Sequence, residues 1–127
     1  MYKILLAEDH DDNRDMLMRR LSRAGFDVRG AVDGGDAVAQ VMSWKPDLVL
    51  MDVSMPVMSG LEATRKIRET LGQSIKIIAL TAHAMNESRD ACMEAGCDAF
   101  ATKPVDLAGL IKEINTQLEQ QKQEQAA

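Results

Sequence analysis

The sequence predicts an α/β protein in which a doubly wound parallel sheet is covered by helices on both faces. Apolar runs of strand length alternate five times with segments whose apolar residues have helical spacing. Two of these runs, residues 47–51 (DLVLM) and 75–80 (IKIIAL), are apolar almost throughout, as buried strands of parallel sheets are. The chain has 127 residues, a length that suits one compact domain. We therefore expect five βα units in a single sheet.

The first βα unit is expected at the amino terminus. Residues 2–7 (YKILLA) should form a buried strand. A helix should then begin near Asp12, a good N-cap residue, and end at Gly25. Residues 26–32 (FDVRGAV) alternate between apolar and polar, which indicates a half-exposed second strand.

The second helix is expected between a glycine pair and a proline. Gly34 and Gly35 are expected to form a turn, and a short apolar-faced helix should follow them. The segment 45–47 (KPD) should end this helix, because the residue before a proline disfavours helical geometry. Residues 47–51 are the expected third strand.

Three further segments complete the alternation up to the last strand. A helix is expected after Gly60, and residues 75–80 should form the fourth strand. Residues 85–95 are expected to be helical, with Gly96 as their stop. Residues 98–102 are a weaker last strand.

A final helix is expected from Asp106. Its apolar residues share one face, namely Leu107, Leu110, Ile111, Ile114 and Leu118. Residues 119–127 are Gln-rich and polar, and we expect a polar tail or the end of this last helix there. The domain proper is expected to span residues 1–118.

Composition excludes several classes of protein. The formal net charge is −5, which disfavours a nucleic-acid partner because no basic stripe offsets phosphate repulsion. No apolar run is long enough to cross a membrane, and no signal peptide is visible. The two cysteines, Cys92 and Cys97, are expected to be reduced and mostly buried. A cytoplasmic protein is therefore expected.

Side chains that could bind a ligand or take part in a reaction follow four of the expected strands. Glu8 and Asp9 follow the first strand, Asp52 the third, Thr81 the fourth and Lys103 the last. Because parallel strands have their carboxyl ends at one edge, and ligands bind at that edge, these side chains should converge there.

The convergence of carboxylates predicts a cation site. All the expected ligands are oxygens, which suits Mg²⁺ or Mn²⁺. Magnesium held in this way takes phosphate oxygens, and Lys103 would be a point charge for the same phosphoryl group. Asp52 lies where a carboxylate nucleophile would lie.

Other acids near the amino terminus have a simpler interpretation. Asp11, Asp12 and Asp15 are expected near the positive end of the first helix, with Asp15 paired to Arg19. His10 is interpreted as a partly exposed loop histidine.

These residues, in this order and after these strands, resemble the receiver domain of bacterial two-component response regulators. The resemblance covers residues 2–118 and rests on an ordered set of motifs: Glu8-Asp9, Asp52 within MDVSMPVMSG, Thr81-Ala82, Phe100 and Lys103-Pro104. It implies a flavodoxin-like (βα)5 fold with strand order 2-1-3-4-5. It also implies a cis bond between Lys103 and Pro104.

The resemblance implies a role for each site residue. Glu8, Asp9, Asp52 and the Ser54 carbonyl would hold the metal. Asp52 would be the phosphoryl acceptor, Thr81 and the Ala82 N–H would bind phosphoryl oxygens, and Lys103 would pair with the phosphoryl group. Phe100 would be the aromatic switch. Many members have Asp where Glu8 stands, and Phe100 lacks the hydroxyl of the frequent Tyr, so that a switch here must work by ring packing.

The implied partners are a histidine kinase or a histidine phosphotransfer protein. A downstream protein would bind the face formed by the fourth helix, the fifth strand and the fifth helix, and the protein would be a monomer or a weak dimer. We expect a signalling relay that catalyses only its own phosphorylation and dephosphorylation. The opening Met and the plain end favour a stand-alone receiver; the alternative is a receiver excised from a hybrid histidine kinase.

Two rivals from other classes fit the residues less well. An aspartate-nucleophile phosphatase would need a second acid where Ser54 stands. A flavodoxin-like FMN carrier would need phosphate donors in the first loop, where Glu8 and Asp9 would repel phosphate.

Overall fold

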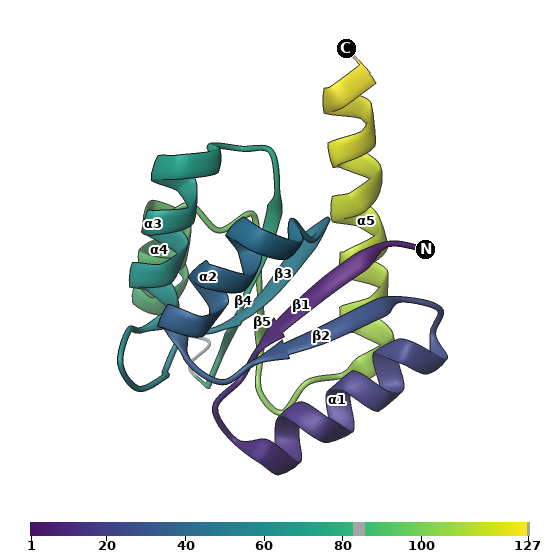
Figure 1. Cartoon of the computed structure of the whole chain (residues 1–127), viewed down its shortest axis with the longest axis horizontal. Coiled ribbons are helices and arrows are strands. Elements are labelled where there is room, and N and C mark those ends of the chain that lie inside the picture. Colours follow the sequence, from purple (N-terminus) through teal and green to yellow (C-terminus); the bar gives the residue numbers. More distant parts are fainter. Residues whose placement is uncertain (83–85, 127) are drawn as a thin grey trace.

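The computed structural model describes residues 1–82 and 86–126. Five parallel strands form one sheet in the order β2-β1-β3-β4-β5, with helices on both faces (Figure 1). The strands are β1 Lys3–Ala7, β2 Asp27–Ala31, β3 Leu48–Asp52, β4 Lys76–Thr81 and β5 Ala99–Thr102. The helices are α1 Asp11–Arg23, α2 Gly34–Trp44, α3 Gly60–Leu71, α4 Asn86–Ala95 and α5 Leu107–Ala126. The predicted fold class and strand order are confirmed.

The sheet separates two hydrophobic clusters, one on each face. The first lies under α2, α3 and α4, which contribute Ala37, Val41, Ala63, Ile67 and Cys92. The second lies under α1 and α5, which contribute Leu21, Leu110, Ile114 and Leu118. The strands β1, β3 and β4 supply alternate residues to both clusters, which explains why their sequences are apolar almost without interruption.

The amino terminus of α1 differs from the prediction. The helix begins at Asp11, and His10 rather than Asp12 is in the N-cap position, with no side-chain cap. Asp11 and Asp12 lie inside the first turn, where the positive end of the helix dipole favours carboxylates. A further anchor comes from Arg14, which donates a 2.8 Å hydrogen bond to the Glu8 carbonyl. The predicted pair of Asp15 with Arg19 is confirmed at 2.7 Å.

The predicted turn at Gly34 and Gly35 is also wrong, because both residues belong to the first turn of α2. Asp33 caps this helix by accepting a 2.7 Å hydrogen bond from the Asp36 N–H. A side chain at Gly34 would collide with the Met58 carbonyl, so this glycine permits close packing instead of making a turn.

The later helix ends follow the prediction closely. Lys45 ends α2 in a left-handed conformation, and Gly96 ends α4 with φ 110°. The predicted start of α4 at residue 85 lies outside the described residues. Helix α5 continues through Ala126 and projects beyond the rest of the molecule (Figure 1). Within residues 1–82 and 86–126, no helix is long and apolar enough to cross a bilayer.

Candidate functional site

The carboxyl edge of the sheet gathers the predicted polar residues. Asp52 and Thr81 are the last residues of β3 and β4, Glu8 follows β1, and Lys103 follows β5. Glu8, Asp52 and Thr81 are buried. Buried polar groups need partners, so the contacts within this edge decide what it can bind.

A single ammonium group joins two of the carboxylates. Lys103 Nζ lies 2.9 Å from Asp52 Oδ2 and 3.1 Å from Glu8 Oε1. The second Asp52 oxygen, Oδ1, accepts a 3.3 Å hydrogen bond from the Ser54 N–H. The structure therefore brings Glu8, Asp52, Ser54 and Lys103 together, although Glu8 and Lys103 are 95 residues apart in the sequence.

Burial and the neighbouring charges change the ionisation of this group. Burial, and then the adjacent Glu8 carboxyl, raise the pKa of Asp52 to about 6. Burial alone would raise the pKa of Glu8 as well, but hydrogen bonds with Asp52 and Lys103 lower it to about 2. Burial opposes the charge on Lys103, yet contacts with Asp52 and Glu8 leave its pKa raised. One further positive charge would balance the two carboxylates against the single ammonium of Lys103.

Two carboxylate oxygens of the site lack a hydrogen-bond donor within the described residues. These atoms, Glu8 Oε2 and Asp9 Oδ1, are buried and accept no hydrogen bond there. They belong to residues that the sequence predicts as metal ligands. Bare anionic oxygens in a buried position are costly in a protein, and a bound cation removes that cost. The donor set therefore fits a hard divalent cation.

Thr81 and Ala82 lie at the end of β4. The Thr81 side chain is buried and its carbonyl accepts a 2.7 Å hydrogen bond from the Lys103 N–H. Ala82 is exposed. The Lys103–Pro104 bond is cis, which confirms the prediction for this bond.

Phe100 lies farther from the edge than the other predicted residues. Its backbone is in register with Ala79, whereas Thr102 is in register with Thr81. The half-buried ring packs against the cluster under α2, α3 and α4. Arg89 of α4 holds its guanidinium group 5.3 Å from the ring centroid, so this ring links β5 to α4.

Three residues that the sequence did not mark as functional support the site. Gly60 starts α3 directly against the backbone of Asp52, and a side chain there would collide with the Asp52 carbonyl. Arg14 holds the Glu8 carbonyl, as described above. His10, interpreted from sequence as a loop residue, directs Nδ1 toward Asp9 Oδ1 at 3.4 Å. Gly60 could have been found from its position in the motif after Asp52; the other two contacts have no sequence pattern.

A cleft of about 460 Å³ opens beside Glu8 and Lys103, between α1 and the start of α5. Its walls include Met16 and Leu17 of α1 and Leu107 of α5. The cleft gives the buried site an accessible, largely apolar margin.

Comparison with known proteins gives the class of domain that has this fold and this site. Residues 4–115 match the family described as the response regulator receiver domain. The chain therefore belongs to the response regulator receiver domain family.

Curated relatives include both kinases and regulators. The chain is 41% identical over 124 residues to hybrid signal transduction histidine kinase I of Dictyostelium discoideum, covering 91% of the chain and 7% of that protein. It is 37% identical over 125 residues to response regulator MprA of Mycobacterium bovis, covering 98% of the chain and 54% of that protein. The chain thus spans 7% of the first of these relatives and about half of the second.

Solved structures share the fold over almost the whole chain. A CheY-like receiver domain protein from Methanospirillum hungatei has a TM-score of 0.91 at 29% identity, with 98% of each chain covered. The receiver domain of a sensor histidine kinase from Pseudomonas aeruginosa has a TM-score of 0.86 at 34% identity, covering 93% of this chain and 98% of that one. The latter structure has a magnesium ion coordinated in its active site cleft.

Proposed function

We propose that this protein is a response-regulator receiver that accepts a phosphoryl group on Asp52 from a phosphohistidine of a histidine kinase or a histidine phosphotransfer protein. The observation that carries the proposal is the buried Asp52 carboxylate, 2.9 Å from the Lys103 ammonium and beside two unpartnered carboxylate oxygens. This arrangement offers a nucleophile, a fixed positive charge and two anionic oxygens for a cation. The proposed receiver unit is residues 1–118.

In the proposed reaction, an Asp52 oxygen forms a bond to phosphorus as the bond between phosphorus and the donor imidazole nitrogen breaks. The imidazole keeps the electron pair of the broken bond. Lys103, which already contacts Asp52, would pair with a phosphoryl oxygen as charge develops. The Thr81 hydroxyl and the Ala82 N–H, at the end of β4, would donate to the remaining oxygens.

Glu8, Asp9, Asp52 and the Ser54 carbonyl would hold the metal of this site, Mg²⁺ or Mn²⁺. The bare oxygens of Glu8 and Asp9 support this assignment. When bound, the ion supplies positive charge to the phosphoryl oxygens.

A small phosphoramidate donor tests the acceptor without knowledge of the natural kinase. Wild type incubated with the donor and Mg²⁺ is expected to gain one phosphoryl group in intact mass, and hydroxylamine should remove it, as it cleaves acyl phosphates. Asp52→Asn should gain none. Asp12→Asn, an exposed aspartate of α1, is the matched control and should behave as wild type. Phosphorylation of Asp52→Asn at the wild-type rate would exclude Asp52 as the acceptor.

We further propose that phosphorylation is read by a downstream protein on the surface of α4, β5 and α5. Thr81 would move toward the phosphoryl oxygens, and the Phe100 ring would turn into the space beneath it. The side chains of Thr81 and Phe100 lie on the same face of the sheet. Phe100 is in register with Ala79, and Ala79 and Thr81 are two residues apart on one strand, so they point to the same face. The contact of Arg89 with the Phe100 ring would carry this movement to α4.

The switch is testable by NMR with a beryllofluoride mimic on Asp52. Amide shifts are expected in α4 and β5 as well as in the loops at Glu8 and Ser54. Phe100→Leu should reduce the response in α4 and β5 and leave the loop response intact. Shifts confined to the two loops would contradict the proposed coupling.

The same site suits a stand-alone receiver and a receiver within a hybrid histidine kinase such as the Dictyostelium relative above. Sequencing the complete gene decides between these contexts. A cytoplasmic location fits the two free, buried thiols of Cys92 and Cys97, because a reducing compartment maintains them.

A further inference from the structure

The unpartnered oxygens of the site face an imidazole rather than the ammonium. Lys103 Nζ contacts Glu8 Oε1 and Asp52 Oδ2. The other Glu8 oxygen, Oε2, lies 3.7 Å from His10 Nδ1, and Asp9 Oδ1 lies 3.4 Å from the same nitrogen. Neither oxygen accepts a hydrogen bond within the described residues, and the Glu8 side chain is 5% exposed. The site thus has an ammonium side and an imidazole side.

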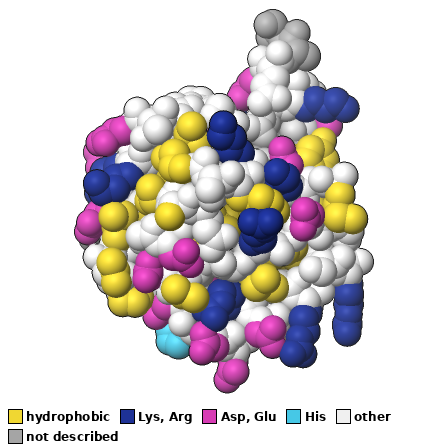
Figure 2. Space-filling model, viewed as in Figure 1, with side chains coloured by type: hydrophobic (Ala, Val, Ile, Leu, Met, Phe, Trp, Pro, Cys, Tyr) yellow, Lys and Arg dark blue, Asp and Glu magenta, His cyan; other side chains and the backbone are white. Residues whose placement is uncertain are grey.

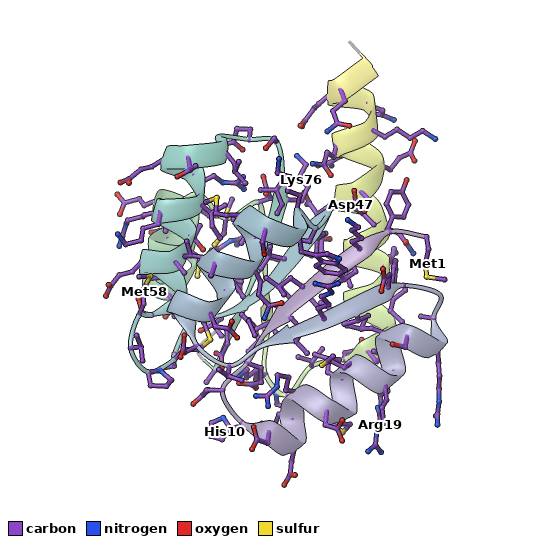
Figure 3. All side chains as sticks on the ribbon, viewed as in Figure 1. Met1, His10, Arg19, Asp47, Met58 and Lys76 are labelled. Atoms are coloured by element: carbon purple, nitrogen blue, oxygen red, sulfur yellow. The ribbon has the colours of Figure 1, made fainter. Side chains whose placement is uncertain are left out.

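The position of His10 is fixed by the backbone at the start of α1. His10 is the N-cap residue, and its carbonyl accepts a 2.9 Å hydrogen bond from the Arg14 N–H. The Arg14 side chain also binds the Glu8 carbonyl, so that one residue anchors the chain on both sides of Asp9. The imidazole is 69% exposed, which leaves it accessible from solvent. Figure 3 labels His10 beside the start of α1, and Figure 2 shows an imidazole at the same lower edge with acidic side chains near it.

The separations of these three atoms suit one metal ion. A nitrogen and an oxygen that each lie about 2.0–2.2 Å from a tetrahedral ion are roughly 3.4 Å apart. The two measured distances from His10 Nδ1 are 3.4 and 3.7 Å, and the ligand atoms of Glu8, Asp9 and His10 all lie within 4.8 Å of one another. Both distances from His10 Nδ1 are therefore close to that of two ligands of one ion.

We propose that His10 joins Glu8 and Asp9 in a site for a divalent transition metal that accepts a nitrogen ligand, such as Co²⁺ or Zn²⁺. Imidazole is a preferred ligand of these ions, whereas Mg²⁺ selects oxygen and retains water. The inference deepens the proposed function, since it rests on the same two carboxylates. It adds that His10 gives this receiver a metal preference that its oxygen ligands alone would not give.

Titration with Co²⁺ and with Mg²⁺ separately tests this preference. His10→Ala is expected to weaken Co²⁺ binding about tenfold or more, because even the loss of an indirect support of a metal ligand costs that much. Mg²⁺ binding should change by less than about twofold, because imidazole is not a magnesium ligand. His83→Ala, which removes the only other histidine of the chain, is the control and should leave Co²⁺ binding unchanged.

A spectroscopic readout separates coordination from a general effect on charge. Proton NMR of the wild type with Co²⁺ should show strongly shifted imidazole ring signals that are absent from His10→Ala and present in His83→Ala. Equal Co²⁺ affinity in wild type and His10→Ala, with Mg²⁺ still bound, would overturn this inference and leave the proposed function intact. Failure of wild type to bind Mg²⁺ would instead overturn the metal site of the proposed function. Loss of the shifted signals in His83→Ala alone would also overturn the role of His10.

Discussion

The two ends of the sheet both bury charged side chains, but they treat those charges differently. At the amino end, Lys76 and Asp98 are 6% and 15% exposed, and each has several partners. At the carboxyl end, Glu8 and Asp52 are 5% and 4% exposed, and they share one ammonium, that of Lys103. Figure 3 labels Lys76 near one end of the sheet and His10 near the other.

The amino-end network consists of Arg68, Lys76, Asp98 and Glu124, and its charges are matched. The Arg68 guanidinium donates to the carbonyls of Gly96, Gly72 and Ile75 and to Asp98 Oδ2 at 2.7 Å. Asp98 also accepts a 2.8 Å hydrogen bond from the Ile77 N–H. Lys76 Nζ lies 3.1 Å from both carboxylate oxygens of Glu124.

This difference in charge pairing separates a structural role at the amino end from the binding role proposed for the carboxyl end. Two cations and two anions at the amino end satisfy one another, so that this network joins α3, β4 and α5 and leaves no charge for a ligand. At the carboxyl end, two oxygens without a hydrogen-bond donor and a raised Asp52 pKa would cost stability whenever no cation is bound. Binding of the proposed cation would offset that cost. Four substitutions test this comparison.

The largest effect is expected at the amino end. Arg68→Met should lower the free energy of unfolding by about 3 kcal/mol, because it leaves the Asp98 carboxylate, only 15% exposed, without its main partner. Urea denaturation followed by circular dichroism measures the change. Arg19→Met, which removes a pair between side chains 72% and 63% exposed, is the control. The control should change stability by less than about 0.5 kcal/mol. Equal effects of the two substitutions would show that the network carries no special stability.

At the carboxyl end, removal of a charge should stabilise the protein. Without divalent cations, Asp52→Asn should raise the free energy of unfolding by roughly 1–2 kcal/mol at neutral pH, because one ammonium then faces one carboxylate. Since the pKa of Asp52 in the folded protein is raised to about 6, wild type binds this proton more tightly when folded. The contribution of protonated Asp52 to stability is present at low pH and is lost as the pH rises through about 6.

Stability measured against pH tests this prediction. The difference between Asp52→Asn and wild type should grow as the pH rises from about 4 to 7. Asp12→Asn, an exposed aspartate of α1, should follow wild type throughout. A constant difference between Asp52→Asn and wild type across this range would contradict the charge argument.

Cation binding should balance the charges at the carboxyl end, as those at the amino end are already balanced, and so stabilise the protein. Mg²⁺ at about ten times its dissociation constant should stabilise wild type by about 1.4 kcal/mol, by mass action. Asp9→Asn should remove most of this gain, because it replaces a carboxylate whose Oδ1 is unpartnered in the described residues. Thermal denaturation with and without Mg²⁺ measures both. Asp15→Asn, on the exposed side of α1, should keep the full gain. An unchanged melting temperature of wild type in Mg²⁺ would disprove the metal site.

The smallest effect is expected at the outer margin of the amino-end network. Glu124→Gln should lower the free energy of unfolding by about 0.5–1 kcal/mol, because Glu124 is 58% exposed and Lys76 keeps a contact with Asp98 at 3.9 Å. Chemical denaturation of the pair Glu124→Gln and Glu119→Gln measures it. Glu119 is exposed on the same helix, and its substitution should have no measurable effect. A larger loss for Glu119→Gln than for Glu124→Gln would contradict the assigned pairing.

Local sequence patterns were enough to predict the order of strands and helices and the edge of the sheet at which the polar residues gather. The spacing of apolar residues and the glycines that end helices, such as Gly25 and Gly96, are local features. They can therefore be recognised before the fold is known. The placement of Asp52 and Thr81 at one edge follows from the same pattern, because parallel strands share their direction. The motif resemblance added the strand order and the cis bond before Pro104, both now confirmed.

Which atoms of those residues are paired depends on the folded chain and could not be predicted from the sequence. Lys103 reaches Glu8 across 95 residues and leaves the oxygens nearest His10 bare, and no spacing in the sequence contains that information. The observed start of α1, Asp11, differs from the predicted start near Asp12 for a similar reason: Arg14 anchors this turn to the Glu8 carbonyl.

The far end of α5 was decided in the same way. Residues 119–127 are polar and Gln-rich, so sequence periodicity could not separate a tail from a helix there. In the structure the Gln121 side chain donates to the Ser74 carbonyl and Glu124 pairs with Lys76 of β4, so the helix continues through Ala126. Secondary structure follows local periodicity, whereas polar partners come from segments far apart in the sequence and depend on how the folded chain aims each side chain.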